Sequence, residues 1–573
     1  MKKLSAIVLS SILLFSLCGC ESQTANSFPI VAEHALTLSH QAGIYEQSFI
    51  LRVAKEKSTN EIYYTTDGTT PTASSTLYRE KEGILISDCT QTASYSLSNK
   101  SVYAYPEYKE PKRVHHATPL RLIEVDKQGN TVASKTASYI VKDDALSYYT
   151  VPVVCITSSP SDFFGKNGML SQQNLANEQK YDMTVEFFDG DRYFSRSSKI
   201  KLGGNWTRYG FPNKTFNVNM KKDENGNKNE KIGFSVFGDQ KKEDMTGVLP
   251  STTRFRLHTG ANDTIGSFFS DALVHRLSEN LNVSTTSYRP CILYLNGEYW
   301  GLYALREWYS ADYFEDNYGV DKDNVLYVDR TYSAWMNPYC MEIKDGDEEL
   351  GRGLIDELMQ FVLNADLSDQ KNYEKLCSMV DMESLADLVL IHSYVGNWDF
   401  MYNNLRMWRT IVPEPGNPYG DCRWRFCVHD ADFSFETVSA DDGLPEEYKA
   451  DYSYLDFFLG DAPNTINNLG WMSRELNCFF REPFVQNASF RSLVKERAQE
   501  VRNAFEKTRA KNFLSWMQKE ISPLMVDHLK RWNRVGYTKQ TWLNVCNLRK
   551  QVIEGRGSAF EADVINTLRR YGS

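Results

Sequence analysis

Two acidic clusters, each placed directly after a strongly apolar segment, constrain this chain more than any other feature. Asp399 follows the apolar stretch 388–395 and stands five residues before Asn404, and Asp430 and Asp432 follow a second apolar run. We expect the first stretch to end a buried helix, so that Asp399 lies at the mouth of the next loop. Neighbouring carboxylates repel each other unless a cation joins them. The clusters therefore predict a catalytic or metal-binding site, although single Asp and Asn residues more often build caps and turns.

The residue types in these clusters are those that phosphoryl transfer requires. A carboxylate accepts the proton of the incoming hydroxyl, and carboxylate and amide oxygens hold Mg²⁺ against the nucleotide phosphates. The corresponding loop of protein kinases reads H-R-D-x-x-x-x-N; Asp399 and Asn404 keep its spacing, but the His-Arg pair is absent. The segment before Asp430 has strand composition, and alternation along a strand would place Asp430 and Asp432 on one face.

The composition of the chain excludes several classes of protein. Its 573 residues are 42% hydrophobic and 13% aromatic, which is enough apolar material for two or more packed domains. The formal net charge of −10, without a long Lys/Arg stripe, argues against a nucleic-acid partner. The sequence has no C-x-x-C pattern, so a zinc site is not indicated. Among the scattered cysteines, Cys422 and Cys427 could pair or remain free thiols.

The N-terminus has the pattern of an export signal. Two lysines precede the apolar run 6–17, which is too short to cross a bilayer. The segment 17–20 reads L-C-G-C and resembles the lipobox of bacterial lipoproteins, in which the last cysteine is acylated. We expect 1–19 to be a lipoprotein signal peptide, Cys20 to anchor the protein in the bacterial cell envelope, and 20–28 to be a linker. A plain secretory signal is the alternative.

The segment 29–142 predicts an all-β domain. Short alternating strands are separated by Gly, Asp, Asn and Ser turns, and no helix-length amphipathic run occurs. The strongest local signal is 63–72, Y-Y-T-T-D-G-T-T-P-T, in which Asp-Gly supplies a turn and Pro71 stops the strand. This stretch resembles the C-terminal type of domain of chitobiase and β-hexosaminidase, a fibronectin III-like β-sandwich. The resemblance implies a spacer or a contact with a cell-surface glycan, and we assign no binding residue in it.

Helix and strand patterns are mixed from 148 to 573, which predicts an α+β domain. A hairpin is expected over 198–218, followed by a helix over 264–280 whose apolar residues recur on one face. A second hairpin over 290–305 has Asn-Gly at its turn, the strongest short-range hairpin signal. A helix, the loop with Asp399 and two strands follow. This order of elements is that of a protein-kinase fold.

Five stretches from about residue 150 onward carry a resemblance to one family. They are G-N-W-T-R and F-P-N-K-T-F at 204–216, L-N-G-E-Y-W-G-L-Y at 295–303, G-N-W-D with N-N at 396–404, H-D-A-D at 429–432, and a helical tail with Trp and Arg. They resemble the CotH family, the spore-coat protein H kinases. Asn213 stands where the family has a lysine, and His429 where it has a tryptophan.

The resemblance implies an atypical protein-kinase-like domain with a helical C-terminal extension. Such a protein would transfer the γ-phosphate of ATP to Ser or Thr hydroxyls of extracytoplasmic proteins. Asp399 would orient and deprotonate the hydroxyl. Asn404 or Asn403 would hold Mg²⁺ or Mn²⁺ together with Asp430, and Asp432 would be a second ligand or would support the first.

The same resemblance implies residues that bind the nucleotide. Lys214 would contact the α and β phosphates, with Arg208 assisting. Asp271 or Glu279, on the helix that follows, would be the partner that fixes Lys214. Glu307 would contact adenine or ribose, or would instead cap the next helix.

Three other functions remain open from the residues alone. The chain could be a non-catalytic surface protein that binds carbohydrate or another partner on a kinase-like scaffold. It could be a glycosidase that uses Asp399 and Asp430 as acid and base, although paired Asp residues suit a metal better. It could also transfer a nucleotide rather than a phosphate, if ATP bound in the reverse direction.

Overall fold

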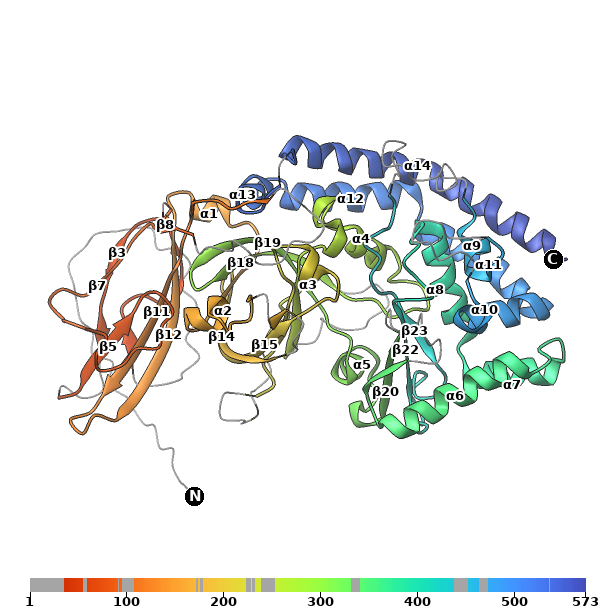
Figure 1. The fold of residues 1–573 in the computed structure, drawn as a ribbon, viewed down its shortest axis with the longest axis horizontal. Coiled ribbons are helices and arrows are strands. Elements are labelled where there is room, and N and C mark those ends of the chain that lie inside the picture. The colour runs from red at the N-terminus through yellow and green to blue at the C-terminus, as the bar shows by residue number, and fades with distance from the viewer. Residues whose placement is uncertain are drawn as a thin grey trace, which may run out of the picture.

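The structure is a computed structural model that describes residues 36–54, 59–90, 92–94, 108–171, 174–175, 179–222, 228, 232–238, 253–330, 341–436, 452–462, 472–534 and 536–572. Three parts follow one another along the molecule: a β-rich N-terminal domain, a β-barrel, and a region of helices around a small sheet (Figure 1). The expected signal peptide 1–19, Cys20 and the linker 20–28 lie outside the described residues. Within the described part, no helix is both long and apolar enough to span a bilayer.

The N-terminal part is β-rich, as predicted. Its main sheet has the order β2-β12-β11-β5-β6, and shorter strands pair as β3-β7, β1-β4 and β10-β8. The bounds are β1 Thr37–Leu38, β2 Gly43–Tyr45, β3 Phe49–Leu51, β4 Val53–Ala54, β5 Glu61–Thr65, β6 Thr76–Leu77, β7 Ile84–Ile86, β8 Thr92–Ala93, β10 Arg113–Val114, β11 Thr118–Val125 and β12 Thr131–Val141. Leu120, Leu122 and Ile86 lie in a shared core, because side chains along a strand alternate between its two faces.

The second part is a closed barrel of the strands β13-β14-β15-β16-β17-β19-β18. They span Val153–Thr157, Tyr181–Asp189, Arg192–Leu202, Phe216–Asn219, Arg254–His258, Glu298–Arg306 and Tyr288–Leu295 in that order. All pairs are antiparallel except β13 with β18, whose parallel pairing closes the barrel. Both predicted hairpins are present: β15 pairs with β16, and β18 turns into β19 at Asn296 and Gly297, which both have positive φ. Positive φ at both central residues is the reason that Asn-Gly suits this turn.

The helix expected over 264–280 is shorter than its apolar pattern indicates. The structure has a 3₁₀ turn at Ala261–Ile265 and then α4 at Ser270–Leu277. Asp263 explains the break, because its carboxylate accepts the backbone N–H groups of Ser267 at 2.7 Å and Ser270 at 2.9 Å. The side chain thus takes over the N–H groups that a longer helix would have bonded to its own carbonyls.

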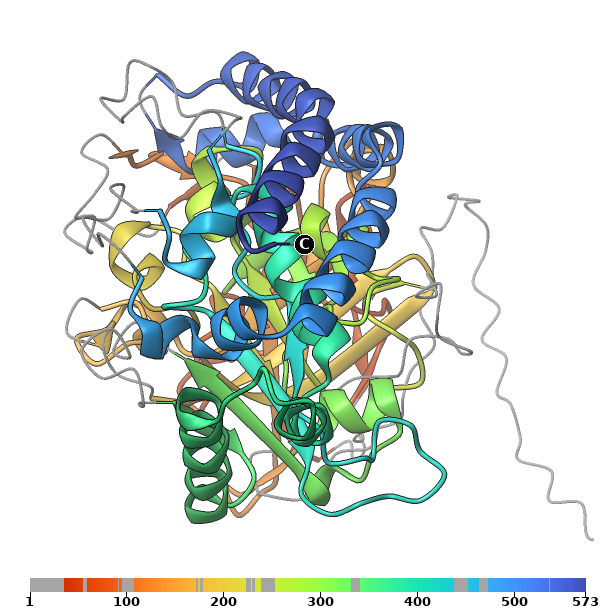
Figure 2. The same ribbon diagram turned by 90° about the vertical axis from the view of Figure 1, so that its right-hand side faces the viewer.

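The third part surrounds a four-stranded sheet with the order β21-β20-β22-β23. These strands are Glu342–Asp345, Val325–Arg330, Leu405–Thr410 and Arg425–Cys427. Helix α8 (Met382–Val395) is buried along its whole length apart from Glu383, and it packs against α9, α11, α14 and β23. The C-terminal helices gather around this region in the end-on view (Figure 2). The other helices are α1 Ala145–Tyr148, α2 Pro160–Phe164, α3 Thr207–Gly210, α5 Ala311–Tyr318, α6 Glu348–Asn364, α7 Gln370–Met379, α9 Tyr454–Leu459, α10 Arg474–Gln486, α11 Ala488–Ala504, α12 Lys507–Ile521, α13 Met525–Arg531 and α14 Lys539–Arg570.

The N-terminal domain is hydrogen-bonded to the barrel rather than only tethered to it. Ala117 donates its N–H to the carbonyl of Gly297 at 2.7 Å, and Tyr299 donates to the carbonyl of His115 at 2.9 Å. The short strand β9 (Tyr108–Lys109) also pairs with β24 (Asn533–Arg534), which lies just after α13. The turn of the β18–β19 hairpin is therefore an interdomain contact, and the domain is more than a passive spacer.

Replacing Gly297 by Ala tests this contact. A Cβ at this position would lie 2.2 Å from the carbonyl oxygen of Ala117, and the residue has a φ of +79°. We expect a loss of about 2 kcal/mol or more, since strain and a backbone clash add. Gly129→Ala is the matched control, because Gly129 also has positive φ but a Cβ there would meet nothing within 4 Å. Thermal unfolding measures both, and equal losses would show that the interdomain contact contributes nothing.

Candidate functional site

The loop that carries Asp399 begins where α8 ends, as the sequence predicted. Gly396 is the C-cap of α8, with φ of +71°, and this left-handed conformation turns the chain out of the helix. Asn397 then fixes the new direction. Its Oδ1 accepts the N–H of Asp399 at 3.2 Å, and its Nδ2 donates to the carbonyl of Asp430 at 3.1 Å. One buried amide thus joins the two acidic clusters that are far apart in the sequence.

Asp399 is a half-buried carboxylate held by three side chains. The hydroxyl of Tyr402 donates to its Oδ1 at 2.6 Å, and the Nδ2 of Asn404 donates to its Oδ2 at 3.1 Å. Asn403 makes longer contacts of 3.4 and 3.5 Å. Burial raises the pKa of Asp399, and these hydrogen bonds partly oppose the rise. A general base is most effective when its pKa approaches the working pH.

Asp430 and Asp432 lie in a loop beyond the strand, so the prediction that strand alternation sets their directions was wrong. Strand β23 ends at Cys427, and Asp430 has φ of +53°. Alternation applies only to extended backbone. The carboxylate of Asp271, on α4, instead holds this loop by accepting the N–H of Ala431 at 2.9 Å.

Asp432 has one oxygen that is occupied and one that is not. Its Oδ2 accepts both the backbone N–H and the Nδ2 of Asn262, at 2.8 and 2.9 Å. Its Oδ1 is buried and has no hydrogen-bond partner within the described part of the chain. Burial and the negative charge of Asp430 raise the pKa of Asp432, and burial with the charge of Asp399 raises the pKa of Asp430 to about 7. Such mutual repulsion is what a bound cation relieves.

The donor set fits a divalent cation that prefers oxygen ligands. The Nδ2 of Asn404 donates to the backbone carbonyl of Asp399 at 3.0 Å as well as to its carboxylate, which leaves Oδ1 as the atom able to bind a cation. Asn404, Asp430 and Asp432 together offer one amide and two carboxylates, which are ligand types that Mg²⁺ and Mn²⁺ take. Among the described residues, no group of three or more His, Cys, Asp or Glu side chains is arranged to hold a metal ion.

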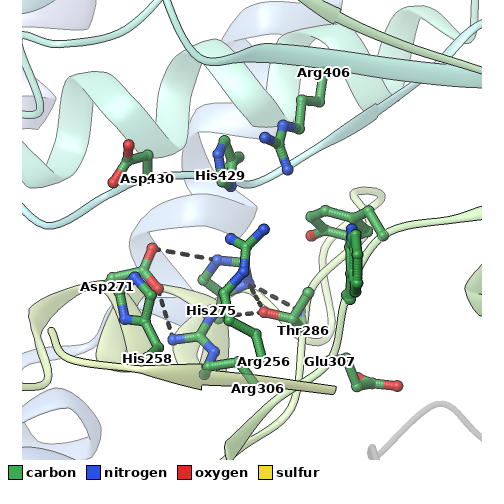
Figure 3. Close-up of a pocket in the computed structure, with 12 residues that line it drawn as sticks. Arg256, His258, Asp271, His275, Thr286, Arg306, Glu307, Arg406, His429 and Asp430 are labelled. Carbon is green, nitrogen blue, oxygen red and sulfur yellow. Dashed lines mark hydrogen bonds and ion pairs between the residues drawn. The ribbon is translucent and has the colours of Figure 1, made fainter. Parts of the chain in front are cut away.

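A pocket opens beside these clusters, between the barrel and the four-stranded sheet (Figure 3). Its walls come from β17, α4 and the end of β19 on one side, and from β22 and the loop after β23 on the other. The lining residues are Arg256, His258, Asp271, His275, Thr286, Arg306, Glu307, Trp308, Tyr309, Arg406, His429 and Asp430. The pocket is rich in arginine, although the cluster motifs that predicted the site are acidic.

Asp271 lines this pocket, and its partners differ from Lys214, the partner that the resemblance implied. Arg306 reaches its Oδ2 at 2.6 Å, and His275 lies 3.4 Å from its Oδ1. Glu279, the other candidate partner of Lys214, is bound by Arg276 at 2.8 Å. The prediction is therefore corrected: each of these carboxylates has an arginine as its partner, where Lys214 was expected.

Lys214 is buried in the barrel and donates to two backbone carbonyls, those of Arg208 and Phe211. Burial lowers its pKa to about 7, so its ammonium is only partly charged at neutral pH. Neither Lys214 nor Arg208 is among the residues that line the pocket. Lys214 ties the short helix α3 to β16, and its part in binding phosphate remains a prediction.

Glu307 lines the pocket, and its carboxylate is already engaged. It accepts the N–H of Ser287 at 2.7 Å and the Nδ2 of Asn317 at 3.2 Å. The alternative that it caps the next helix was wrong, because Ser310 is the N-cap of α5. In Figure 3 its carboxylate points away from Asp430 and Arg406. Contact with adenine or ribose stays a prediction.

Sequence reasoning gave no role to five residues of the site, which are Arg256, Asn262, Arg306, Asn397 and Arg406. Asn397 belongs to the G-N-W-D motif, but nothing in the motif shows that its amide reaches the second cluster. The strand R-F-R-L-H at 254–258 alternates basic and apolar residues, and this pattern could have indicated a basic face directed at a ligand. The other positions carry no local signal, because their roles depend on contacts between distant segments.

The fold and the site together define a class of protein: a β-rich domain joined to a barrel and a helical region, with an acidic and amide-rich centre beside an arginine-lined pocket. The family model described as CotH kinase protein matches residues 200–560, which is more than half of the chain. The chain belongs to the CotH kinase protein family. A second model, the chitobiase/beta-hexosaminidase C-terminal domain, matches residues 40–136. No curated protein matches the chain significantly.

Proposed function

We propose that this CotH-type protein is an active, metal-dependent protein kinase that transfers the γ-phosphate of ATP to Ser or Thr hydroxyls of extracytoplasmic proteins. The observation that carries the proposal is the joining of Asp399 and Asn404 to the loop of Asp430 and Asp432 through one buried amide, that of Asn397. A base, an amide ligand and two carboxylates in one place are the parts that phosphoryl transfer uses. The order of hairpins, helix, loop and strands supports a kinase-like fold for the domain.

Each residue has a stated task in this proposal. Asp399 accepts the proton of the acceptor hydroxyl and orients its oxygen, while Tyr402 and Asn404 hold the carboxylate in position. Asn404, Asp430 and Asp432 would hold Mg²⁺ or Mn²⁺. When bound, such a cation neutralises charge on the phosphates that it contacts. The pocket between the barrel and the sheet would receive the nucleotide.

The proposal includes a location and partners. Cys20 would carry a lipid that anchors the protein in the bacterial cell envelope, and the acceptor would be a secreted or surface protein. The N-terminal domain, which we propose to be fibronectin III-like, could add contact with a surface glycan. The net charge of −10 supports the absence of a nucleic-acid partner.

The proposal is tested by incubating the purified protein with γ-labelled ATP, Mg²⁺ or Mn²⁺, and a mixed acceptor such as casein. We expect label on Ser or Thr of the acceptor with the wild-type protein. Absence of label, together with no thermal shift by ATP and metal, would favour the non-catalytic surface protein instead. Label from the α position of ATP on the acceptor would indicate transfer of the nucleotide.

Asp430→Asn is expected to weaken metal dependence most directly. The amide cannot match the charge of a carboxylate, so the metal concentration for half-maximal transfer should rise at least about tenfold. Asp366→Asn is the control, because Asp366 is exposed and only accepts hydrogen bonds within its own turn, which Asn can also do. A titration of Mn²⁺ against the initial rate measures both. An unchanged midpoint for Asp430→Asn would exclude this carboxylate as a ligand.

A further inference from the structure

Two arginines face each other across the pocket from different parts of the fold. Arg256 comes from β17 of the barrel, and Arg406 comes from β22 of the four-stranded sheet. Figure 3 shows Arg406 and His429 on one side of the pocket and Arg256 on the other. We propose that Arg256 and Arg406 form a clamp that holds the phosphate tail of the nucleotide between the barrel and the sheet. This inference rests on the proposed function and names the residues that bind its substrate.

The hydrogen bonds of the three pocket arginines separate this pair from Arg306. Both terminal nitrogens of Arg306 are occupied, Nη1 by Asp271 at 2.6 Å and Nη2 by the hydroxyl of Thr286 at 2.6 Å, and its Nε is buried without a partner among the described residues. Arg256 uses its Nε, which donates to Asn217 at 2.8 Å, and no hydrogen bond of its terminal nitrogens is seen among the described residues. Arg406 gives its Nη2 to Asp329 at 2.9 Å, and no hydrogen bond of its Nη1 is seen among the described residues. Donors therefore remain on both sides of the pocket.

The electrostatics of the pocket agree with this assignment. Burial lowers the pKa of Arg256 to about 10, and the positive charge of Arg406 adds to the decrease. Against the opposing effect of burial, Asp329 raises the pKa of Arg406, so this guanidinium already has a carboxylate partner, and an anion in the pocket would chiefly stabilise the charge of Arg256. Burial also lowers the pKa of His258 to about 3, so this ring is neutral at pH 7. His258 therefore adds no positive charge to that of the arginines in the pocket.

A phosphate chain is the anion whose chemistry suits the pair. A guanidinium presents a planar fork of donors that matches phosphate oxygens and remains charged at any physiological pH. Lys214, by contrast, donates to carbonyls and has a pKa lowered to about 7 by burial. Asp430 lines the same pocket as both arginines. The clamp would thus bring the phosphates next to the carboxylates that hold the metal.

The clamp is tested by measuring the binding of adenosine, AMP, ADP and ATP to the full chain in the presence of Mg²⁺. For the wild-type protein we expect affinity to increase with the number of phosphates. Arg256→Gln and Arg406→Gln should each weaken ATP binding at least about tenfold and leave adenosine binding unchanged. Arg409→Gln is the matched control on β22, because Arg409 lies over the ring of Trp424 and outside the pocket. It should bind ATP as the wild type does.

The outcomes separate the clamp from the proposed function. If both variants keep the wild-type ratio of ATP to adenosine affinity, the clamp is wrong, and continued phosphoryl transfer would leave the kinase proposal intact. A wild-type protein that neither binds ATP nor transfers phosphate would overturn both. Arg256→Lys guards against a variant that fails to fold, because it keeps the charge and loses the fork. Arg256→Lys should keep part of the ATP affinity. Wild-type affinity in this variant would contradict a bidentate contact between the guanidinium and the phosphate oxygens.

Discussion

Asp399→Asn is expected to reduce phosphoryl transfer by about 10³-fold while ATP affinity changes by no more than about threefold. The substitution keeps the size of the side chain and can still accept the hydrogen bond from Tyr402, which spans 2.6 Å in the wild type. It removes the only property that the proposed base needs, the ability to take a proton. Initial rates with labelled ATP and a nucleotide-binding assay measure the two effects separately. A decrease of less than about tenfold would exclude Asp399 as the base.

Tyr402→Phe provides the complementary control for this role. The hydrogen bond from Tyr402 lowers the pKa of Asp399 against the larger effect of burial, so its loss should raise that pKa further. A base must be deprotonated to act, and the acidic limb of the pH–rate profile should therefore move to higher pH. The rate should decrease more at about pH 6 than at about pH 8. A profile that keeps its shape would mean that the titration of Asp399 does not govern the rate.

Arg531→Met is expected to destabilise the barrel and its contact with α13 by about 3–5 kcal/mol. Arg531 and Glu298 form an ion pair at 2.8 Å, and both side chains are 0% exposed. The guanidinium also lies over the rings of Trp300 and Trp532. Methionine can fill much of the space, but it leaves the Glu298 carboxylate buried without its cation. The midpoint of thermal unfolding should decrease by roughly 10 °C.

The double variant Arg531→Met with Glu298→Met separates charge from packing. Removing both members of a buried pair leaves no stranded charge and is often close to neutral. The double variant should therefore be more stable than Arg531→Met alone, by about 2 kcal/mol or more. If the two are equally unstable, the contacts with Trp300 and Trp532 account for the effect instead.

The sequence predicted the features of this fold that depend on local chemistry. The apolar stretch before Asp399 is the end of a buried helix, and the Asn296-Gly297 turn joins two strands, because helix burial and positive φ leave strong local patterns. The spacing of Asp399 and Asn404 placed both residues in one loop after this helix, where the structure has them. Each of these features depends on residues within a few positions of one another.

Features that depend on distant residues were not predictable in the same way. The parallel pairing of β13 with β18 closes the barrel, but the sequence of neither strand identifies the other as its partner. Asp271 was expected beside Lys214, whereas the fold places Arg306 next to it. The directions of Asp430 and Asp432 depend on a loop with positive φ rather than on strand alternation. Such contacts depend on the packing of segments that are distant in the chain, and they leave little pattern in a single sequence.

The pairing of β9 with β24 has a consequence for how the chain is made. A ribosome completes the N-terminal domain long before it reaches residues 533–534, so β9 lacks its partner strand during most of synthesis. The same holds for Glu298, whose cation Arg531 emerges late. A chain that stops early thus leaves the edge of β9 unpaired and Glu298 without Arg531. Quality-control proteases recognise such unfinished surfaces, and only a chain that extends through these residues would hide them.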